Sequence, residues 1–462
     1  MLSPSPSTAG GPGLRRELTV ISAMALVVSN MIGTGIFTTT GFLAGDLGRP
    51  SLVLGVWLLG GVAAMAGCLA YAELGINLPR SGGEYVYLRE AWGPVWGFLS
   101  GWVSFFAGFS APIAAGALGF SEYLGQFSPS LSINSPSASP LGLSGLRLGR
   151  GQLLAVGVIA IFAVVNILGL SSAARVQNLL TATKLGVLGV FLVLAFTVGG
   201  GNWGNFAVLT PSGSSHSVGT QLALSLVFVM YTYSGWNAAT YVAEEMKSPE
   251  RTLPRALLAG TAVVTLVYLA LNVAFIYALP LGSLKGVIRV GAVTATALFG
   301  SRAGVLFSGV MAISILSCVS AMVVVGPRVY YAMAQDGCFF SGAARVHPRW
   351  KTPVQAILYQ AIASALMVLT GTFEILITYI GFTLVLFAAF AAAGLFRLRQ
   401  RPGWKALPVF PGAYPLAPAI FVGVSLWMLA WTLVLRPKPA LLGLLTVASG
   451  SILYWWHFRK AN

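Results

Sequence analysis

The sequence is poor in charge. Only 8% of its 462 residues are Asp, Glu, Lys or Arg, whereas a soluble domain carries about 25%. Acidic residues are the scarcest, with 11 Asp and Glu against 27 Lys and Arg and a formal net charge of +16. In a soluble protein this excess of positive charge would suggest binding to nucleic acid. Here, however, the basic residues fall on short loops between long apolar runs. With 56% hydrophobic residues, the composition excludes a soluble globular domain and predicts a polytopic membrane protein.

Cysteine and histidine are also scarce, with three of each. Two cysteines lie within apolar runs and the third, Cys338, just after one, so we predict no disulfide framework. His216 and His347 fall in loops, and His457 lies at the end of the last apolar run. No two of them can be grouped with carboxylates or cysteines as a metal or acid–base cluster. We therefore expect neither an enzyme nor a cofactor.

Long apolar runs dominate the rest of the chain. A helix needs about 20 predominantly apolar residues to cross a membrane. Runs of that length fall near 18–45, 51–78, 92–122, 151–171, 176–198, 218–246, 255–280, 303–335, 353–371, 373–396, 415–436 and 438–458. They predict an all-α protein with twelve transmembrane helices. The Ser, Pro and Gly-rich residues 1–13 predict a disordered tail.

The basic residues predict the orientation. If both termini are cytoplasmic, most Lys and Arg fall on cytoplasmic segments, as in the loop that holds Arg345 and Arg349. Few of them, such as Arg49, then fall outside. The positive-inside rule thus favours cytoplasmic termini. The polar segments at about 123–150 and 281–302 would lie outside.

The first apolar run is interrupted by Gly33-Thr34-Gly35. Each glycine lowers helix stability by roughly 1 kcal/mol relative to alanine. Backbone groups freed inside a bilayer are tolerated only where they are buried in protein or line a cavity. This interruption predicts a discontinuous helix and a binding site within the membrane.

A second interruption, Ser234-Gly235, occurs in the sixth run. Interrupted helices at matching places in two halves are typical of transporters with inverted repeats. We predict a first five-helix repeat over 14–200, an inverted second repeat over 201–396, and two further helices over 397–462. The alternative is that these glycines only serve close helix packing, as in GxxxG motifs.

The two interruptions suggest the chemistry of the site. The N–H groups of Gly33, Thr34 and Gly35, at the start of a half-helix, would attract a carboxylate. Carbonyls freed near Ile32 and from Tyr231 to Ser234 would accept from an ammonium. Together they describe a neutral amino acid, since no charged side chain is nearby. The predicted substrate-binding residues are Ile32, Gly33, Thr34, Gly35, Tyr231, Thr232, Ser234, Gly235 and Asn237.

Lys184 lies near the middle of the fifth run. A lysine at that depth costs at least about 2.5–3.5 kcal/mol, so it needs a partner or a function. Our hypothesis is that its ammonium replaces a sodium ion between carbonyls of the first helix and hydroxyls of the eighth, where Ser314, Ser317 and Ser320 recur. Lys184, Tyr231 and these serines are the predicted gating or coupling residues. The alternative for Lys184 is a side chain that extends toward the cytoplasmic surface.

Other polar residues allow two interpretations each. Glu73 and the pair Glu244-Glu245 lie near the cytoplasmic ends of their helices. They either pair with the basic loops or form a gate that opens during transport. Tyr231 is either an aromatic lid over the substrate or a core aromatic.

Several stretches resemble the amino acid–polyamine–organocation superfamily, and most closely the L-type amino acid transporters and their bacterial relatives. They are "SNMIGTGIF", "AYAELGINLPRSGGEYVYLREAWG", "YSGWNAATYVAEEMKSPERTLPRA", "PRVYYAMAQDG" and "HPRWKTP". The resemblance implies an inverted five-helix repeat, recognition of the substrate backbone at the two interruptions, and alternating access. It also implies that Tyr231 is the aromatic gate and that Lys184 is the lysine of sodium-independent members.

The resemblance has departures. Animal members use a cysteine between the third and fourth helices to bind a glycoprotein heavy chain, and this loop has none. We therefore expect no disulfide-linked heavy chain and a prokaryotic inner membrane. Thr34 stands where serine is common, and Tyr231 replaces the usual phenylalanine.

We expect a sodium-independent exchanger of neutral L-amino acids, with proton coupling left open. The alternative within the same fold is a proton-coupled carrier of cationic amino acids or polyamines, which needs an acidic group such as Glu73 at the site. A membrane-embedded enzyme and a channel are the alternatives from other classes.

Overall fold

The computed structural model describes residues 18–80, 82–133, 147–168, 173–211, 215–350 and 352–458. Within these ranges the side chains of 173–181, 244–245, 332 and 457–458 are not described. The predicted tail at 1–13 and the side chains of Glu244, Glu245 and His457 therefore lie outside the described part.

The described residues are helical and contain no strand; Leu18 and Met246 form an isolated β-bridge. The α-helices are α1 (Val20–Met31), α2 (Thr39–Leu47), α3 (Pro50–Asn77), α4 (Glu84–Trp92), α5 (Pro94–Val103), α6 (Ala111–Leu124), α7 (Arg150–Ile167), α8 (Ala173–Thr197), α9 (Val218–Tyr233), α10 (Pro249–Ala278), α11 (Leu281–Leu284), α12 (Val290–Phe299), α13 (Ser301–Gln335), α14 (Val354–Thr370), α15 (Phe373–Leu398), α16 (Leu416–Leu435) and α17 (Pro437–Leu453).

Short 3-10 and π-helical segments continue or connect these helices. The π-helical segments are η2 (Ser104–Ser110), which joins α5 to α6, and η9 (Tyr454–Phe458), which follows α17. The 3-10 segments are η1 (Gly35–Phe37), η3 (Pro129–Leu131), η5 (Trp203–Phe206), η6 (Ala238–Glu245), η7 (Ser341–Ala344) and η8 (Pro411–Ala413).

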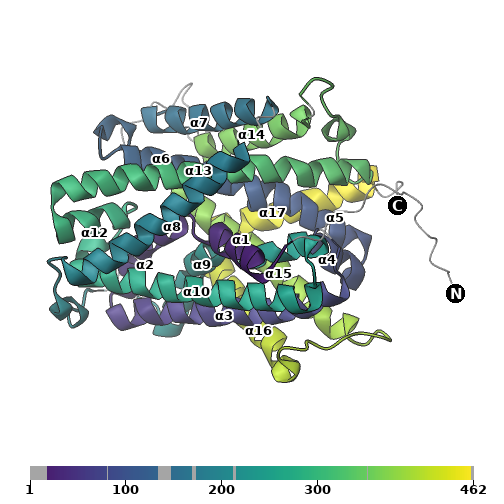
Figure 1. Ribbon diagram of the computed structural model, residues 1–462, viewed down its shortest axis with the longest axis horizontal. Coiled ribbons are helices and arrows are strands. Elements are labelled where there is room, and N and C mark those ends of the chain that lie inside the picture. The colour runs from purple at the N-terminus through teal and green to yellow at the C-terminus, as the bar shows by residue number, and fades with distance from the viewer. Residues whose placement is uncertain are drawn as a thin grey trace.

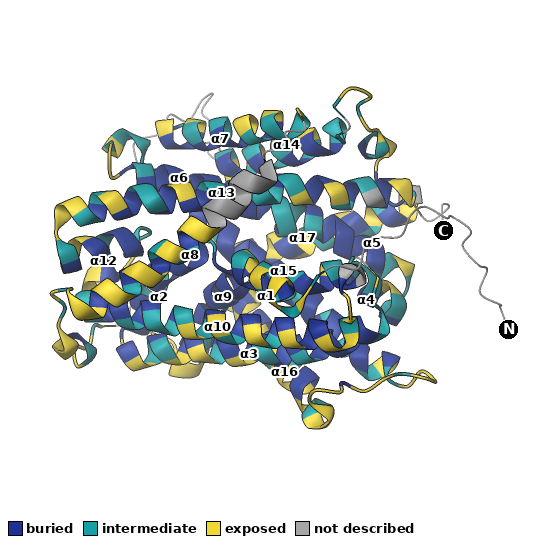
Figure 2. Cartoon of the chain, viewed as in Figure 1, coloured by how far each residue is buried: buried dark blue, intermediate teal, exposed yellow. Residues whose placement is uncertain are grey.

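Most long helices run roughly parallel to the long axis of the molecule, and α8 crosses α13 obliquely (Figure 1). In the described part, eight helices are long and apolar enough to cross a membrane, and four further apolar helices have 10–17 residues. The most apolar 18-residue window of α15 is 78% buried, whereas that of α17 is only 28% buried. The core therefore lies around α9 and α15, and outer helices alternate buried and exposed residues (Figure 2).

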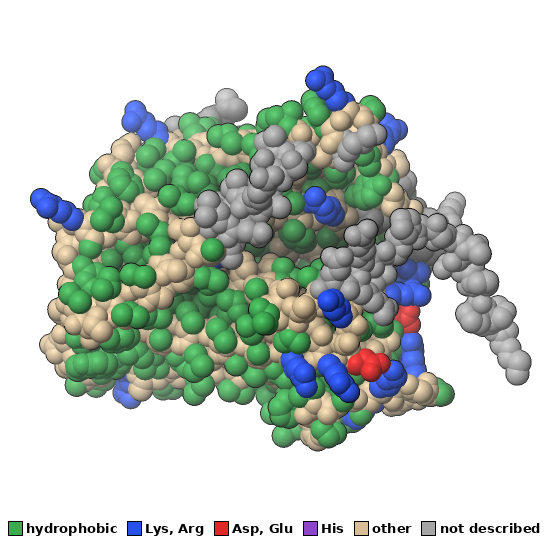
Figure 3. Space-filling view, in the orientation of Figure 1, with side chains coloured by type: hydrophobic (Ala, Val, Ile, Leu, Met, Phe, Trp, Pro, Cys, Tyr) green, Lys and Arg blue, Asp and Glu red, His purple; other side chains and the backbone are tan. Residues whose placement is uncertain are grey.

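The outer surface is apolar, as a lipid environment requires. Leu306 is 71% exposed and Ile452 is 70% exposed. Figure 3 shows hydrophobic side chains over the middle of one face, with Lys and Arg gathered mainly toward its right-hand end. This inversion of the usual surface composition supports a multi-pass membrane protein.

The helix positions agree closely with the predicted apolar runs, with two differences: α4 lies between the second and third runs, and α11 and α12 follow the seventh. The segment 281–302 was expected to be a polar connection outside the membrane, but it folds into α11 and α12. Leu281, Leu284 and Val290 are fully buried there. The segment is short and less hydrophobic than a span, so its pattern did not distinguish a packed helix pair from a loop.

The first and sixth predicted spans are both discontinuous. In the first, α1 ends at Met31 and η1 begins at Gly35. In the sixth, α9 ends at Tyr233 and η6 begins at Ala238. The helices stop where the sequence places glycine, and the two interruptions are packed against each other.

This close packing requires glycine at position 35. A Cβ atom there would lie 2.5 Å from Thr232 Oγ1 and 2.9 Å from Thr232 Cα, so the backbone of α9 would have to move. A Cβ atom on Gly33 would meet nothing closer than Cys318 Sγ, at 3.9 Å.

We predict that Gly35→Ala lowers the free energy of unfolding by about 1–3 kcal/mol, the range found for overpacked cores. The matched Gly33→Ala variant should unfold like the native protein. Thermal unfolding of both purified proteins in detergent checks this. Equal unfolding temperatures for the two variants would contradict the packing described here.

Candidate functional site

The first interruption leaves three consecutive amide groups without a partner. Among the described residues, nothing accepts a hydrogen bond from the N–H groups of Gly33, Thr34 or Gly35. Phe37 and Thr38 already donate to Thr34 O and Gly35 O, which fixes the turn that follows. Three unpaired donors at the start of a helical segment favour an anionic group such as a carboxylate.

The second interruption spans Ser234 to Asn237 and turns sharply at Gly235, whose φ is +98°. A Cβ atom on Gly235 would lie 3.0 Å from the backbone carbon of Asn30 in α1. Both the left-handed backbone and the close approach therefore require glycine. This turn holds the end of α9 against the end of α1.

Side chains connect the two interruptions directly. The hydroxyls of Thr34 and Tyr231 are hydrogen-bonded at 2.9 Å, and both side chains are buried. Tyr268 OH, from α10, lies 2.6 Å from Met31 O and 3.1 Å from Thr232 O. The carbonyls that the helix ends leave free thus share one phenolic donor.

Thr232 also connects the two halves. Its Oγ1 lies 2.8 Å from Thr39 Oγ1 at the start of α2 and donates to Phe228 O at 2.9 Å. The hydroxyl of this predicted substrate-binding residue is therefore engaged in packing α9 against α2.

A cavity of about 40 Å³ lies between the interruptions. Its walls include Gly33, Thr34, Gly35, Tyr231 and Ser234, all of them predicted site residues. The described residues that line it carry no charged side chain. The volume holds a few water molecules. The structure therefore brings most of the predicted site together around a small neutral cavity.

Lys184 lies against the first interruption. Its Nζ donates to Ile32 O at 2.5 Å and to Ser29 O at 3.3 Å, and the side chain is only 1% exposed. Both contacts are to backbone carbonyls at the end of α1, and the replacement of a sodium ion by this ammonium stays a prediction. The side chain is buried among α1, α8 and α13 and does not extend to the surface.

Lys184 also has a contact on α13. Its Nζ lies 3.7 Å from Cys318 Sγ. Ser314, one of the three predicted serines, donates to Val310 O of its own helix at 2.8 Å. Ser317 and Ser320 lie on the same helix, and a coupling role for the serines stays a prediction.

Asn237 contacts a carboxylate instead of the cavity. Its Nδ2 donates to Glu84 Oε1 at 2.8 Å, and Tyr71 OH donates to the same oxygen at 2.8 Å. Glu84, the first residue of α4, is only 8% exposed. This cluster joins the second interruption to the segment between α3 and α5.

Glu73, in α3, contacts the basic segment that begins at the end of α15. Its Oε1 is 3.4 Å from Arg399 Nε and accepts from Trp404 Nε1 at 3.1 Å. Of the two readings of this residue, the pairing with a basic loop is the one seen in this state.

Sequence reasoning missed three residues that organise the site: Tyr268, Cys318 and Glu84. The sequence could have indicated Tyr268, because a tyrosine within a long apolar run needs a hydrogen-bond partner for its hydroxyl. It gave no indication of Cys318 beyond its place in an apolar run. Glu84 lies in a polar stretch between two apolar runs, and only the fold determines that its side chain is buried. In the described part no group of His, Cys, Asp and Glu could hold a metal ion.

Two discontinuous helices facing each other across a small cavity are typical of secondary transporters. A model of the amino acid permease family matches residues 18–457. The chain belongs to this family, part of the amino acid–polyamine–organocation superfamily.

Curated relatives are similar along almost the whole chain. The serine/threonine exchanger SteT of Bacillus subtilis is 31% identical over 97% of this chain and 99% of its own length. Large neutral amino acids transporter small subunit 2 of Rattus norvegicus is 31% identical over 98% of this chain and 84% of its own. Asc-type amino acid transporter 1 of Mus musculus is 29% identical over 95% of this chain and 80% of its own length. These relatives are transporters and not enzymes.

The buried carboxyl of Glu84 has a consequence for stability. Burial raises its pKa from 4.5 to about 7, although the hydrogen bonds from Tyr71 and Asn237 act in the opposite direction. The folded protein therefore binds this proton more tightly than the unfolded chain does. Stability should fall as the pH rises from about 4.5 through about 7 and then level off.

We predict that Glu84→Gln, which cannot ionise, loses this part of the pH dependence. The unfolding temperature measured between pH 5 and pH 8 checks it. Glu90→Gln, on the exposed side of the same helix and next to Arg401, is the matched control and should keep the native profile. A Glu84→Gln profile parallel to the native one would show that Glu84 is not the group responsible.

Proposed function

We propose that this protein is a sodium-independent exchanger of small and medium neutral L-amino acids that works by alternating access. The observation that carries the proposal is the row of unpaired N–H groups at Gly33, Thr34 and Gly35 beside an uncharged buried cavity. Two relatives, named as a serine/threonine exchanger and as a small subunit of a large neutral amino acids transporter, support a neutral amino acid as the substrate.

The substrate carboxylate would bind the three N–H groups, where the positive end of a helical segment stabilises it. The ammonium would bind the nearby carbonyls. Ile32 O and Thr232 O already accept from Lys184 and Tyr268, but a carbonyl oxygen has two lone pairs. The cavity of about 40 Å³ has to widen for the side chain. Separation of Tyr231 from Thr34 is the simplest way to open it.

Lys184 supports independence from sodium. An ammonium that donates to Ile32 O and Ser29 O supplies the positive charge that a bound cation would give these carbonyls. Because this charge is covalently attached, no ion has to bind with each substrate.

The finer architecture is part of the proposal. Twelve spans, repeats at 14–200 and 201–396 and two appended helices at 397–462 place the two discontinuous helices at corresponding positions. The distribution of basic residues supports cytoplasmic termini in a prokaryotic inner membrane. The segment 123–150 has no cysteine, so we propose no disulfide-linked heavy chain.

The cationic amino acid or polyamine carrier needs a carboxylate at the site. Glu73, the candidate for this role, is engaged with Arg399 and Trp404. No observation favours this alternative over neutral substrates.

The proposal predicts that purified protein in liposomes preloaded with L-serine takes up radiolabelled L-serine in a saturable manner. Replacing sodium by choline should not change the rate. Excess L-alanine or L-threonine should inhibit the uptake of labelled L-serine, whereas arginine or putrescine should not. Inhibition by arginine or putrescine would favour the cationic carrier, and uptake that does not saturate would favour a channel. If a pH gradient drives uptake into liposomes that contain no amino acid, the protein is a proton symporter and not an exchanger.

We predict that Lys184→Ala lowers exchange by at least about tenfold, because Ile32 O and Ser29 O lose their charged donor in a buried site. The same assay on Lys405→Ala is the control. Lys405 is an exposed lysine paired with Glu250, and its loss should leave exchange nearly unchanged. Near-normal exchange by Lys184→Ala would contradict the proposed role of the lysine.

A further inference from the structure

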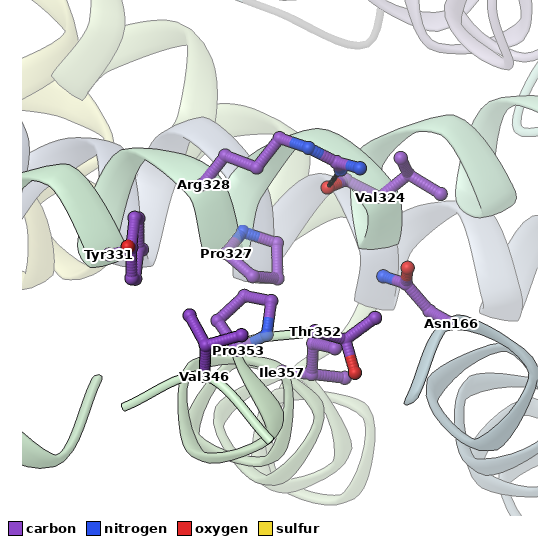
Figure 4. Close-up of a pocket in the computed structure, with 9 residues that line it drawn as sticks. All are labelled: Asn166, Val324, Pro327, Arg328, Tyr331, Val346, Thr352, Pro353 and Ile357. Carbon is purple, nitrogen blue, oxygen red and sulfur yellow. Dashed lines mark hydrogen bonds between the residues drawn. The ribbon is translucent and has the colours of Figure 1, made fainter. Parts of the chain in front are cut away.

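A second and larger cavity lies between α7, α13 and α14, and none of the described residues that line it also lines the central cavity. Its volume is about 280 Å³, about seven times that of the central cavity. In Figure 4, Pro327 of α13 and Pro353, just before α14, face each other across it, with Asn166 and Tyr331 on either side. The transport proposal uses none of these residues.

Specific hydrogen bonds hold the walls of this cavity in place. Pro327 has no N–H, so the carbonyl of Val323, four residues earlier, lacks its usual helical donor. Asn166 Nδ2, at the end of α7, donates to Val323 O at 2.6 Å instead. Thr352 Oγ1 donates to Ile167 O at 2.7 Å and ties the segment before α14 to the same helix end. The cavity is thus a built feature of the fold.

Arg328 is the one basic residue among those that line this cavity. Its side chain lies along α13 and donates from Nη1 to Val324 O of its own helix (Figure 4). No carboxylate of the described part forms an ion pair with it. A guanidinium has five N–H donors, so most of its hydrogen-bonding capacity is available to an anion.

The surroundings indicate where such an anion comes from. Two of the helices that form its walls, α7 and α14, carry exposed apolar side chains farther along, among them Ile161 at 63% and Ile362 at 57%. Val346, which lines the cavity, belongs to the basic connection that holds Arg345 and Arg349. Arg328 is itself exposed, and an arginine between lipid-facing and basic surface suits the phosphate of a phospholipid head group.

We propose that this cavity binds the phosphate of an anionic phospholipid. The N–H groups of Arg328 donate to the phosphate oxygens as charge-assisted hydrogen bonds, and Tyr331 and Asn166 border the head group. The acyl chains lie on the exposed apolar faces of α7 and α14. In the orientation proposed above, the lipid belongs to the cytoplasmic leaflet.

Native mass spectrometry of the purified protein in detergent tests this, with phosphatidylglycerol and phosphatidylcholine added in equal amounts. The native protein should retain phosphatidylglycerol preferentially, and Arg328→Gln should lower its occupancy about tenfold. Arg302→Gln changes an exposed arginine at the opposite end of the same helix and should retain the lipid. Val346→Trp leaves the long helices unchanged, fills the cavity and should also lose it.

Three outcomes would overturn the proposal. The first is equal retention of the two lipids by the native protein. The second is native occupancy in Arg328→Gln, or in Val346→Trp should the arginine variant not fold. The third is displacement of the lipid by an equal concentration of glycerol phosphate, which would assign the cavity to a soluble phosphate. Because none of these measurements uses transport, failure of the exchange proposal leaves their interpretation unchanged.

Discussion

The structure depends on how backbone groups are satisfied where two helices stop inside an apolar bundle. A peptide group without a partner there costs several kcal/mol. The carbonyls at these helix ends have partners in Tyr268 and Lys184. The N–H groups of Gly33, Thr34 and Gly35 have none among the described residues. This asymmetry identifies the amide side as the place where a ligand has most to contribute.

The arrangement also explains how a buried site can remain neutral although a charge lies beside it. Lys184 directs its ammonium at backbone oxygens behind the first interruption and does not line the central cavity. The cavity itself presents hydroxyls, amides and small side chains. The zwitterionic substrate proposed above would meet dipoles of both signs there, without a net charge to attract or repel it.

Those features of the fold and of the candidate site that have local causes could be predicted from the sequence. The two interruptions follow from glycines inside apolar runs, and the need of Lys184 for a buried partner follows from the cost of a charge at that depth. The partners of Asn237 could not be predicted, because Glu84 reaches it from a segment more than 150 residues earlier in the chain. The same limit applies to Cys318, whose Sγ lies 3.7 Å from Lys184 Nζ although the two residues are 134 positions apart. The helices α11 and α12 were missed since their apolar pattern is too short to identify them.

The position of Tyr268 has a consequence for how the two interrupted segments move. Its hydroxyl has a single proton, yet it lies within hydrogen-bonding distance of Met31 O and Thr232 O, at 2.6 and 3.1 Å. When one carbonyl withdraws, the proton can turn to the other, so the number of hydrogen bonds is conserved during the displacement. A displacement of the two segments relative to each other would therefore leave the phenol of Tyr268 with a hydrogen bond in the apolar interior.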